Sequence, residues 1–136
     1  MNSSCIFCKV LSGEIPAQKV YEDAYVLAFL DINPASRGHT LVVSKEHYEL
    51  LTQMPEREYL SFMQSVQKVA KGLMKYTDAV NILQNNGKDA GQLVPHVHMH
   101  IIPRRPGDGL HIGVWRSAHD PDLDKVQKVI QSLLKD

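Results

Sequence analysis

Apolar residues change their spacing along the chain, and these changes divide the first half into strands followed by a helix. Between residues 20 and 44 they form short runs rich in β-branched and aromatic side chains, which predict strands at 20–21, 24–30 and 39–44. From Pro55 the spacing becomes three or four residues, as in the series that leads from Leu60 to Leu73. This period predicts an amphipathic helix of about five turns.

The second half of the pattern adds two strands and a terminal helix. Apolar runs predict strands at 80–84 and 97–102, and Pro103 is expected to end the second of them. Residues 121–135 have helical spacing, whereas the glycine-rich stretch 105–120 predicts an irregular arm. Strands joined by short turns, together with one long helix, predict an antiparallel sheet of the α+β class. We expect one domain over residues 1–136, in which 105–136 form a C-terminal extension.

Composition excludes several classes of protein. The chain has 136 residues, of which 43% are hydrophobic and 22% are charged, as in an ordinary globular domain rather than a disordered or fibrous one. Fifteen basic residues balance fifteen acidic ones, so the chain lacks the positive charge that favours nucleic acid. No apolar run approaches the ~20 residues that span a bilayer, and residues 1–5 do not resemble a signal peptide. We therefore expect a cytoplasmic protein with neither a nucleic-acid nor a membrane partner.

Three histidines alternate with apolar residues in the last predicted strand. Because side chains in a strand alternate between faces, His96, His98 and His100 should share one face, while residues 97, 99 and 101 face the helix. A buried imidazole without a hydrogen-bond partner costs about 1–3 kcal/mol, so three on one face indicate a function. They could bind a metal, or one could act as a nucleophile that its neighbours orient. The spacing alone does not decide between these interpretations.

The loop before this strand, residues 85–92, offers backbone N–H groups and amide side chains close to the histidine face. Glycine-containing loops can arrange successive N–H groups into an anion-binding nest, which would hold a phosphate beside His98. An ordinary connection between two strands is the alternative interpretation of this loop.

Residues 91–102, GQLVPHVHMHII, resemble the signature of the histidine triad (HIT) family, in which His-x-His-x-His is followed by two apolar residues. Segments 5–9, 13–17, 31–34 and 38–43 resemble further parts of the same family in the expected order. The resemblance covers about residues 5–104.

The resemblance implies a fold, an assembly and an activity. The implied fold is a five-stranded antiparallel sheet with two helices, in a homodimer whose sheets join. The implied activity is that of a nucleotidyl hydrolase or transferase acting at the α-phosphate of a nucleotide conjugate, with zinc in one branch of the family. No Walker-type glycine-lysine motif is present to indicate kinase-like transfer.

The family's functional residues carry over to positions that match in this chain. His98 is implied as the nucleophile, and His39, His96 and His100 as residues that orient it or contact phosphate. Asp31 matches the ribose-binding position and Asn85 the polar position beside the phosphate. The loop residues expected to bind nucleotide are Gly91, Gln92 and Leu93. Leu93 stands where many members carry Ser or Thr, so a side-chain donor to the phosphate or leaving group is missing.

Cys5-x-x-Cys8 has the spacing of zinc ligands, but two cysteines make only half a site. The pair could also act as redox thiols or simply pack as small apolar residues. The resemblance completes the site, because HIT proteins with this start bind zinc through two further histidines that match His47 and His96. Two sulfur and two nitrogen ligands suit one structural zinc per chain.

The leading hypothesis is a HIT-type enzyme that cleaves a dinucleoside polyphosphate or a nucleoside phosphoramidate through a covalent nucleotidyl-histidine on His98. The first alternative is a nonenzymatic or very slow nucleotide-binding or signalling module, since Leu93 removes a polar group. A small zinc module that binds nucleic acid or protein is a third class, against which the zero net charge argues.

Overall fold

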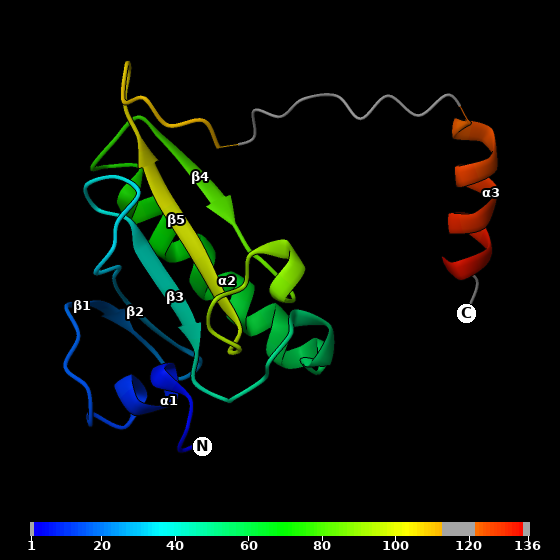
Figure 1. The fold of residues 1–136 in the computed structure, drawn as a ribbon. Coiled ribbons are helices and arrows are strands. Elements are labelled where there is room, and N and C mark those ends of the chain that lie inside the picture. The colour runs from blue at the N-terminus through cyan, green and yellow to red at the C-terminus, as the bar shows by residue number, and fades with distance from the viewer. Residues whose placement is uncertain (1, 113–121, 135–136) are drawn as a thin grey trace.

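The computed structural model describes residues 2–112 and 122–134, and in them the chain forms a five-stranded antiparallel sheet (Figure 1). Strands β1 (Lys19–Glu22), β2 (Val26–Leu30), β3 (Thr40–Ser44), β5 (His98–Arg104) and β4 (Ala79–Leu83) follow one another across it in that order. The helices are α1 (Ile6–Leu11), α2 (Glu56–Leu73) and α3 (Leu123–Leu134), with short 3-10 turns at Leu51–Gln53 and Lys88–Ala90. The predicted α+β architecture is confirmed.

One face of the sheet packs against α2 (Figure 1). The alternation of β5 turns Met99 and Ile101 to this face, as predicted, where they meet Phe62 and Val66 of the helix. These residues belong to a continuous apolar cluster, and Phe62 is among the largest fully buried side chains. The 18-residue helix has the length and the apolar stripe that this packing requires.

The opposite face is covered by α1 and carries the histidines. Phe7, Cys8 and Val10 of this helix are buried with Cys5 against four residues of the sheet, Leu27, Phe29, Leu41 and Val43. The pattern of the sequence did not predict α1, because six residues are too few to show a helical period. The sheet therefore lies between a long helix on one face and one short helix on the other.

Pro103 does not end β5, so that prediction is wrong. The strand continues to Arg104, and Pro103 pairs with Val80 of β4. The carbonyl oxygen of Pro103 accepts a hydrogen bond from Ser36 Oγ at 2.6 Å, on the side of β5 where β3 has already ended. Because the nitrogen of a strand residue faces the same side as its carbonyl, the missing N–H costs no bond between strands.

The second strand also begins later than predicted, at Val26 rather than residue 24. The Asp23 carboxylate accepts hydrogen bonds from the N–H groups of Tyr25 (2.7 Å) and Val26 (3.0 Å). These bonds hold the preceding residues in a turn, which is a common role of aspartate.

The predicted terminal helix is α3, and Figure 1 shows it apart from the sheet. Its apolar side chains at Leu123, Val126, Val129, Ile130 and Leu133 are exposed. Of the predicted irregular arm, residues 113–120 lie outside the described part of the chain, as do 121 and 135–136. Among the described residues, no helix has the length and apolar character needed to cross a membrane.

Candidate active site and metal centre

The hydrogen bonds around His98 fix which of its ring nitrogens is free. Its Nδ1–H donates to the backbone carbonyl of His96 at 2.6 Å. A neutral imidazole carries one proton, so the other nitrogen, Nε2, keeps its lone pair. No described residue forms a hydrogen bond with Nε2. This is the arrangement that a nucleophilic imidazole needs.

A chain of donors runs through the other two histidines of the face. The backbone N–H of Ala35 donates to His39 Nδ1 at 2.9 Å, so the proton of a neutral His39 is on Nε2. That nitrogen lies 3.0 Å from His100 Nδ1 and donates to it. The proton of His100 is therefore on its own Nε2, which is left as a donor. The chain ends in an N–H group beside His98, whose ring centroid is 5.0 Å from that of His100.

Burial keeps these rings neutral. Desolvation lowers the pKa of His98 and of His39 below the usual value, and it lowers the pKa of His100 to about 4. A neutral His98 keeps the lone pair that attack on phosphorus requires.

A cavity of about 610 Å³ lies over this face of the sheet, between α1 and the 85–94 segment. The predicted residues Asp31, Asn85, Gly91 and Leu93 line it, together with the histidines at positions 39, 98 and 100. Asp31 Oδ1 accepts the N–H of Asn33 at 2.8 Å, and its Oδ2 lies 3.6 Å from His39 Nε2. Asn85 donates to the Gly91 carbonyl at 3.3 Å and so ties the two ends of the loop together.

The side chain of Gln92 is engaged within the loop. Its Oε1 accepts the N–H of Gly87 at 2.7 Å, and its Nε2 donates to the carbonyl groups of Glu49 and Val94. Gln92 does not line the cavity. The structure thus places this residue in support of the loop, while its predicted contact with nucleotide stays a prediction.

Two contributors to the site were missed by sequence reasoning. The backbone N–H of Ala35 sets the tautomer of His39, and a backbone group leaves no signal in residue type. Phe7 packs edge-on against His98, with ring centroids 4.9 Å apart and an interplanar angle of 85°. Its position between Cys5 and Cys8 in the sequence indicated that Phe7 lies near the metal site, but it did not indicate contact with His98.

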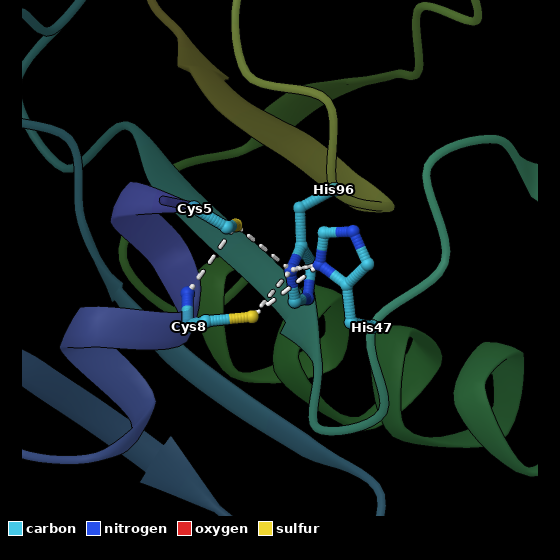
Figure 2. A group of neighbouring side chains, drawn as sticks. All are labelled: Cys5, Cys8, His47 and His96. Atoms are coloured by element: carbon cyan, nitrogen blue, oxygen red, sulfur yellow. Dashed lines mark hydrogen bonds between the residues drawn. The ribbon is translucent and has the colours of Figure 1, made fainter. Parts of the chain in front are cut away.

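Cys5, Cys8, His47 and His96 converge on one point (Figure 2). The two cysteines come from the start of α1, His47 follows β3, and His96 precedes β5. Sulfur–nitrogen distances are 3.3 Å for Cys5–His96, 3.6 Å for Cys8–His96 and 3.3 Å for Cys8–His47. A tetrahedral zinc would separate such ligands by about 3.5 Å, so the four atoms have the spacing of a zinc site.

The hydrogen bonds around the cluster leave its ligand atoms available. His96 Nε2–H donates to the Ser44 carbonyl at 2.7 Å, which leaves the lone pair on the Nδ1 that faces the sulfurs. The Cys5 sulfur accepts the N–H of Cys8, and the Cys8 sulfur accepts the N–H of Asn2, both at 3.4 Å. Burial lowers the pKa of His96 to about 4 and raises the pKa of Cys5, so a bound metal would meet a neutral imidazole and displace thiol protons. This donor set fits zinc.

A second cluster, Asp31, His39 and His100, also brings three potential ligand atoms together. Here the bond from Ala35 N–H occupies the Nδ1 lone pair of His39 and puts the proton on the nitrogen that faces the cluster. A metal would have to remove this proton from a neutral imidazole. The arrangement suits donation to an anion better than metal binding.

Comparison with known proteins identifies the family. A family model described as the HIT domain matches residues 12–107. An uncharacterized HIT-like protein of Methanocaldococcus jannaschii is 53% identical over 128 residues, which cover 93% of this chain and 98% of that protein. The chain belongs to the HIT family.

Some of the similar relatives carry enzyme names. The adenosine 5'-monophosphoramidase of Saccharomyces cerevisiae is 42% identical, over 98% of this chain and 83% of its own length. An adenylylsulfatase of Arabidopsis thaliana is 37% identical, over 99% of this chain and 70% of its own length.

Solved structures agree with the fold. The crystal structure of a HIT family member from Bacillus subtilis, 39% identical, superposes with a TM-score of 0.88 over 98% of this chain and 99% of that one. A zinc-bound histidine triad protein from Mycobacterium smegmatis, 41% identical, has a TM-score of 0.74 over 95% of this chain and 91% of its own. In this chain the arrangement of Cys5, Cys8, His47 and His96 fits a zinc site, and a zinc-bound member of the family is among the similar structures.

Proposed function

We propose that this HIT protein cleaves nucleotide conjugates at the α-phosphate through a covalent nucleotidyl-histidine on His98. The observation that carries the proposal is the bond from His98 Nδ1–H to the His96 carbonyl, which leaves Nε2 as the free nitrogen of a neutral ring that lines the cavity. Nε2 attacks phosphorus, a P–N bond forms, and the bond from phosphorus to the leaving group breaks, with an amine leaving group taking up a proton from water as it departs. Water then hydrolyses the P–N bond and releases the nucleotide, so one difficult displacement becomes two easier ones.

The chain of donors supplies the charge stabilisation that this reaction needs. His100 Nε2–H and backbone N–H groups of the 85–94 segment would face the phosphoryl oxygens as negative charge builds on them. The carboxylate of Asp31, which lines the cavity, would accept a ribose hydroxyl. His96 and His39 would orient the other two histidines, and Gly91, Gln92 and Asn85 would shape the loop beside the phosphate.

The lining of the cavity favours a phosphoramidate over a dinucleoside polyphosphate. Among the described residues that line it, no Lys or Arg is present, and Asp31 is an acidic group. A polyphosphate leaving group would bring several negative charges without a cation to balance them, whereas an amine brings none. Relatives named for an adenosine monophosphoramidate and an adenylylsulfate support an adenosine nucleotide as substrate.

Zinc, bound by the Cys5, Cys8, His47 and His96 cluster, would supply a structural cross-link, because four protein ligands leave no open position. The chain's own side chains then carry the reaction, and one zinc per chain is expected by elemental analysis.

A substrate panel tests the proposal. Adenosine phosphoramidate, diadenosine tri- and tetraphosphate and a nucleotide sugar are each mixed with wild-type protein, with His98→Ala and with His111→Ala, an exposed histidine outside the site. We expect turnover of the phosphoramidate, an adduct of one nucleotidyl group trapped by acid quench and mass spectrometry, and neither in His98→Ala. Nucleotide binding without turnover or adduct would instead support the slow binding or signalling module.

We further propose a homodimer in which the sheets of two chains join, within the cytoplasm and with residues 1–136 as one domain. In support, β4 is an edge strand and exposes half of Ile82. An edge strand has unpaired backbone groups that a second copy can satisfy. Sedimentation that shows a monomer at micromolar concentration would contradict this proposal.

A further inference from the structure

Phe7 connects the metal cluster to the histidine face. It is in the first turn of α1 between Cys5 and Cys8, and it is 7% exposed. Its ring meets the rings of His98 and His96 edge-on, with centroids 4.9 Å and 6.0 Å away. No other aromatic side chain of the described residues stacks on both a cluster histidine and His98.

The ring of His98 needs apolar support. Under the proposed function its Nε2 has to remain without a protein partner, so the only hydrogen bond that orients the ring is the one at Nδ1. A single bond leaves the ring free to tilt about that contact. Edge-to-face contact with an aromatic ring restricts this tilt.

The helix that carries Phe7 cannot hold itself in place. Isolated helices shorter than about 12–15 residues are marginal in water, and α1 has six residues. The backbone on either side of Phe7 has a further attachment, because Cys5 and Cys8 belong to the same cluster as His47 and His96. Figure 2 shows Cys5 and Cys8 pointing from the start of α1 toward His96 and His47. A metal in the cluster would fix the backbone on both sides of Phe7.

We propose that Phe7 is a positioning residue for His98 and that the metal-binding turn holds it against the imidazole ring. Metal binding at the Cys5–Cys8 turn is then coupled to the orientation of the nucleophile, although His98 is not a ligand. The catalytic meaning of this coupling rests on the proposed function, but the coupling itself does not require substrate.

The test observes the His98 ring by nitrogen-15 NMR in the ligand-free, zinc-loaded protein. In the wild type we expect the Nδ1–H tautomer with a sharp signal. In Phe7→Leu the ratio of the Nδ1–H to the Nε2–H tautomer should fall by about 2- to 10-fold, which corresponds to the loss of one aromatic contact. Phe62→Leu is the matched control, because it makes the same change at a buried position on the opposite face.

A second arm removes zinc from the wild type with a chelator. The His98 signals should move in the direction seen for Phe7→Leu, while the amide signals of α2 and of Met99 stay in place. Unchanged His98 signals in Phe7→Leu, an equal change in Phe62→Leu, or global loss of the α2 signals on zinc removal would each overturn the inference. A failure of the proposed function would look different, because His98 would respond to Phe7 and zinc but form no nucleotidyl adduct.

Discussion

The two faces of the sheet are built from the same strands but are stabilised in different ways. On the α2 face, alternate residues of three strands and an 18-residue helix form one apolar cluster. On the α1 face, β5 contributes His98 and His100, a large cavity takes up space, and a six-residue helix is the cover. The free energy that hydrophobic burial contributes to folding is proportional to the apolar area removed from water, so the α1 face contributes less of it than the α2 face.

The difference shows how one sheet can provide both stability and a reactive site. The α2 face needs no functional group and can be packed densely. The α1 face holds neutral imidazoles, and its cover is fixed by side chains that could bind a metal rather than by further apolar contacts. We therefore expect substitutions on the two faces to separate activity from stability.

The largest expected effect is on activity alone. His98→Ala should lower kcat by at least about 10⁴-fold, because removal of a nucleophile disables the covalent route while binding contacts remain. The melting temperature and the affinity for nucleotide should change little, since α2 keeps its apolar contacts and α1 loses the edge-on contact of Phe7 with the His98 ring but keeps its packing against the sheet. Steady-state kinetics and calorimetry measure the two effects, with His111→Ala as the control. Activity within tenfold of the wild type would exclude His98 as the nucleophile.

The second prediction compares the same substitution on the two faces. Phe62→Ala should reduce the free energy of unfolding by about 3–5 kcal/mol, because Phe62 is 1% exposed in the dense cluster. Phe29→Ala should cost clearly less, because Phe29 already borders the cavity. Urea denaturation of both variants makes the comparison. Equal losses would mean that the α1 face is packed as tightly as the α2 face.

Sequence pattern was most informative where a period extends over many residues. The spacing from Leu60 to Leu73 predicted α2, and strict alternation predicted which face of β5 carries His98 and which meets the helix. The terminal helix was found for the same reason. The antiparallel arrangement of the sheet was predicted from the short turns that join its strands.

The features that were missed depend on single contacts. Helix α1 has too few residues for a period, and Pro103 is tolerated only because its nitrogen faces away from β4. His47 was assigned through resemblance, since nothing in its local sequence joins it to Cys8. The amide of Gln92 turns into the loop to meet Glu49 and Val94, and no residue pattern encodes that direction.

The third prediction concerns the metal. Loss of the metal should affect the α1 face alone. Cys8→Ser should lower zinc affinity by at least about 100-fold, since a ligand contributes more than an outer-shell partner. Through linkage this would destabilise the zinc-loaded protein by about 2–3 kcal/mol. Some turnover should remain because His98 is not a ligand, whereas His96→Ala should reduce both stability and activity.

Elemental analysis and thermal denaturation with and without chelator check this prediction. Less than about a tenth of an equivalent of zinc in protein purified without added metal, together with a chelator-insensitive melting temperature, would show that the cluster is not a zinc site.

The smallest expected effect is a pH-dependent one at the edge of the α2 face. Asp23 joins α2 to the β1–β2 turn, because its carboxylate accepts hydrogen bonds from Ser65 Oγ (2.5 Å), Tyr21 OH (2.8 Å) and two backbone N–H groups. Burial alone would raise the pKa of Asp23, but these hydrogen bonds outweigh it and hold the pKa below its usual value. A carboxyl group whose pKa is lowered by folding stabilises the protein at pH values above the pKa of the unfolded chain, about 3.9, and this contribution is lost as the pH falls through the folded value.

Asp23→Asn should therefore destabilise the protein by about 1 kcal/mol at pH 7, and the difference from the wild type should shrink as the pH falls below about 4. Denaturation of both proteins across that range tests it, and a difference that stays constant with pH would mean that the charge of Asp23 does not contribute.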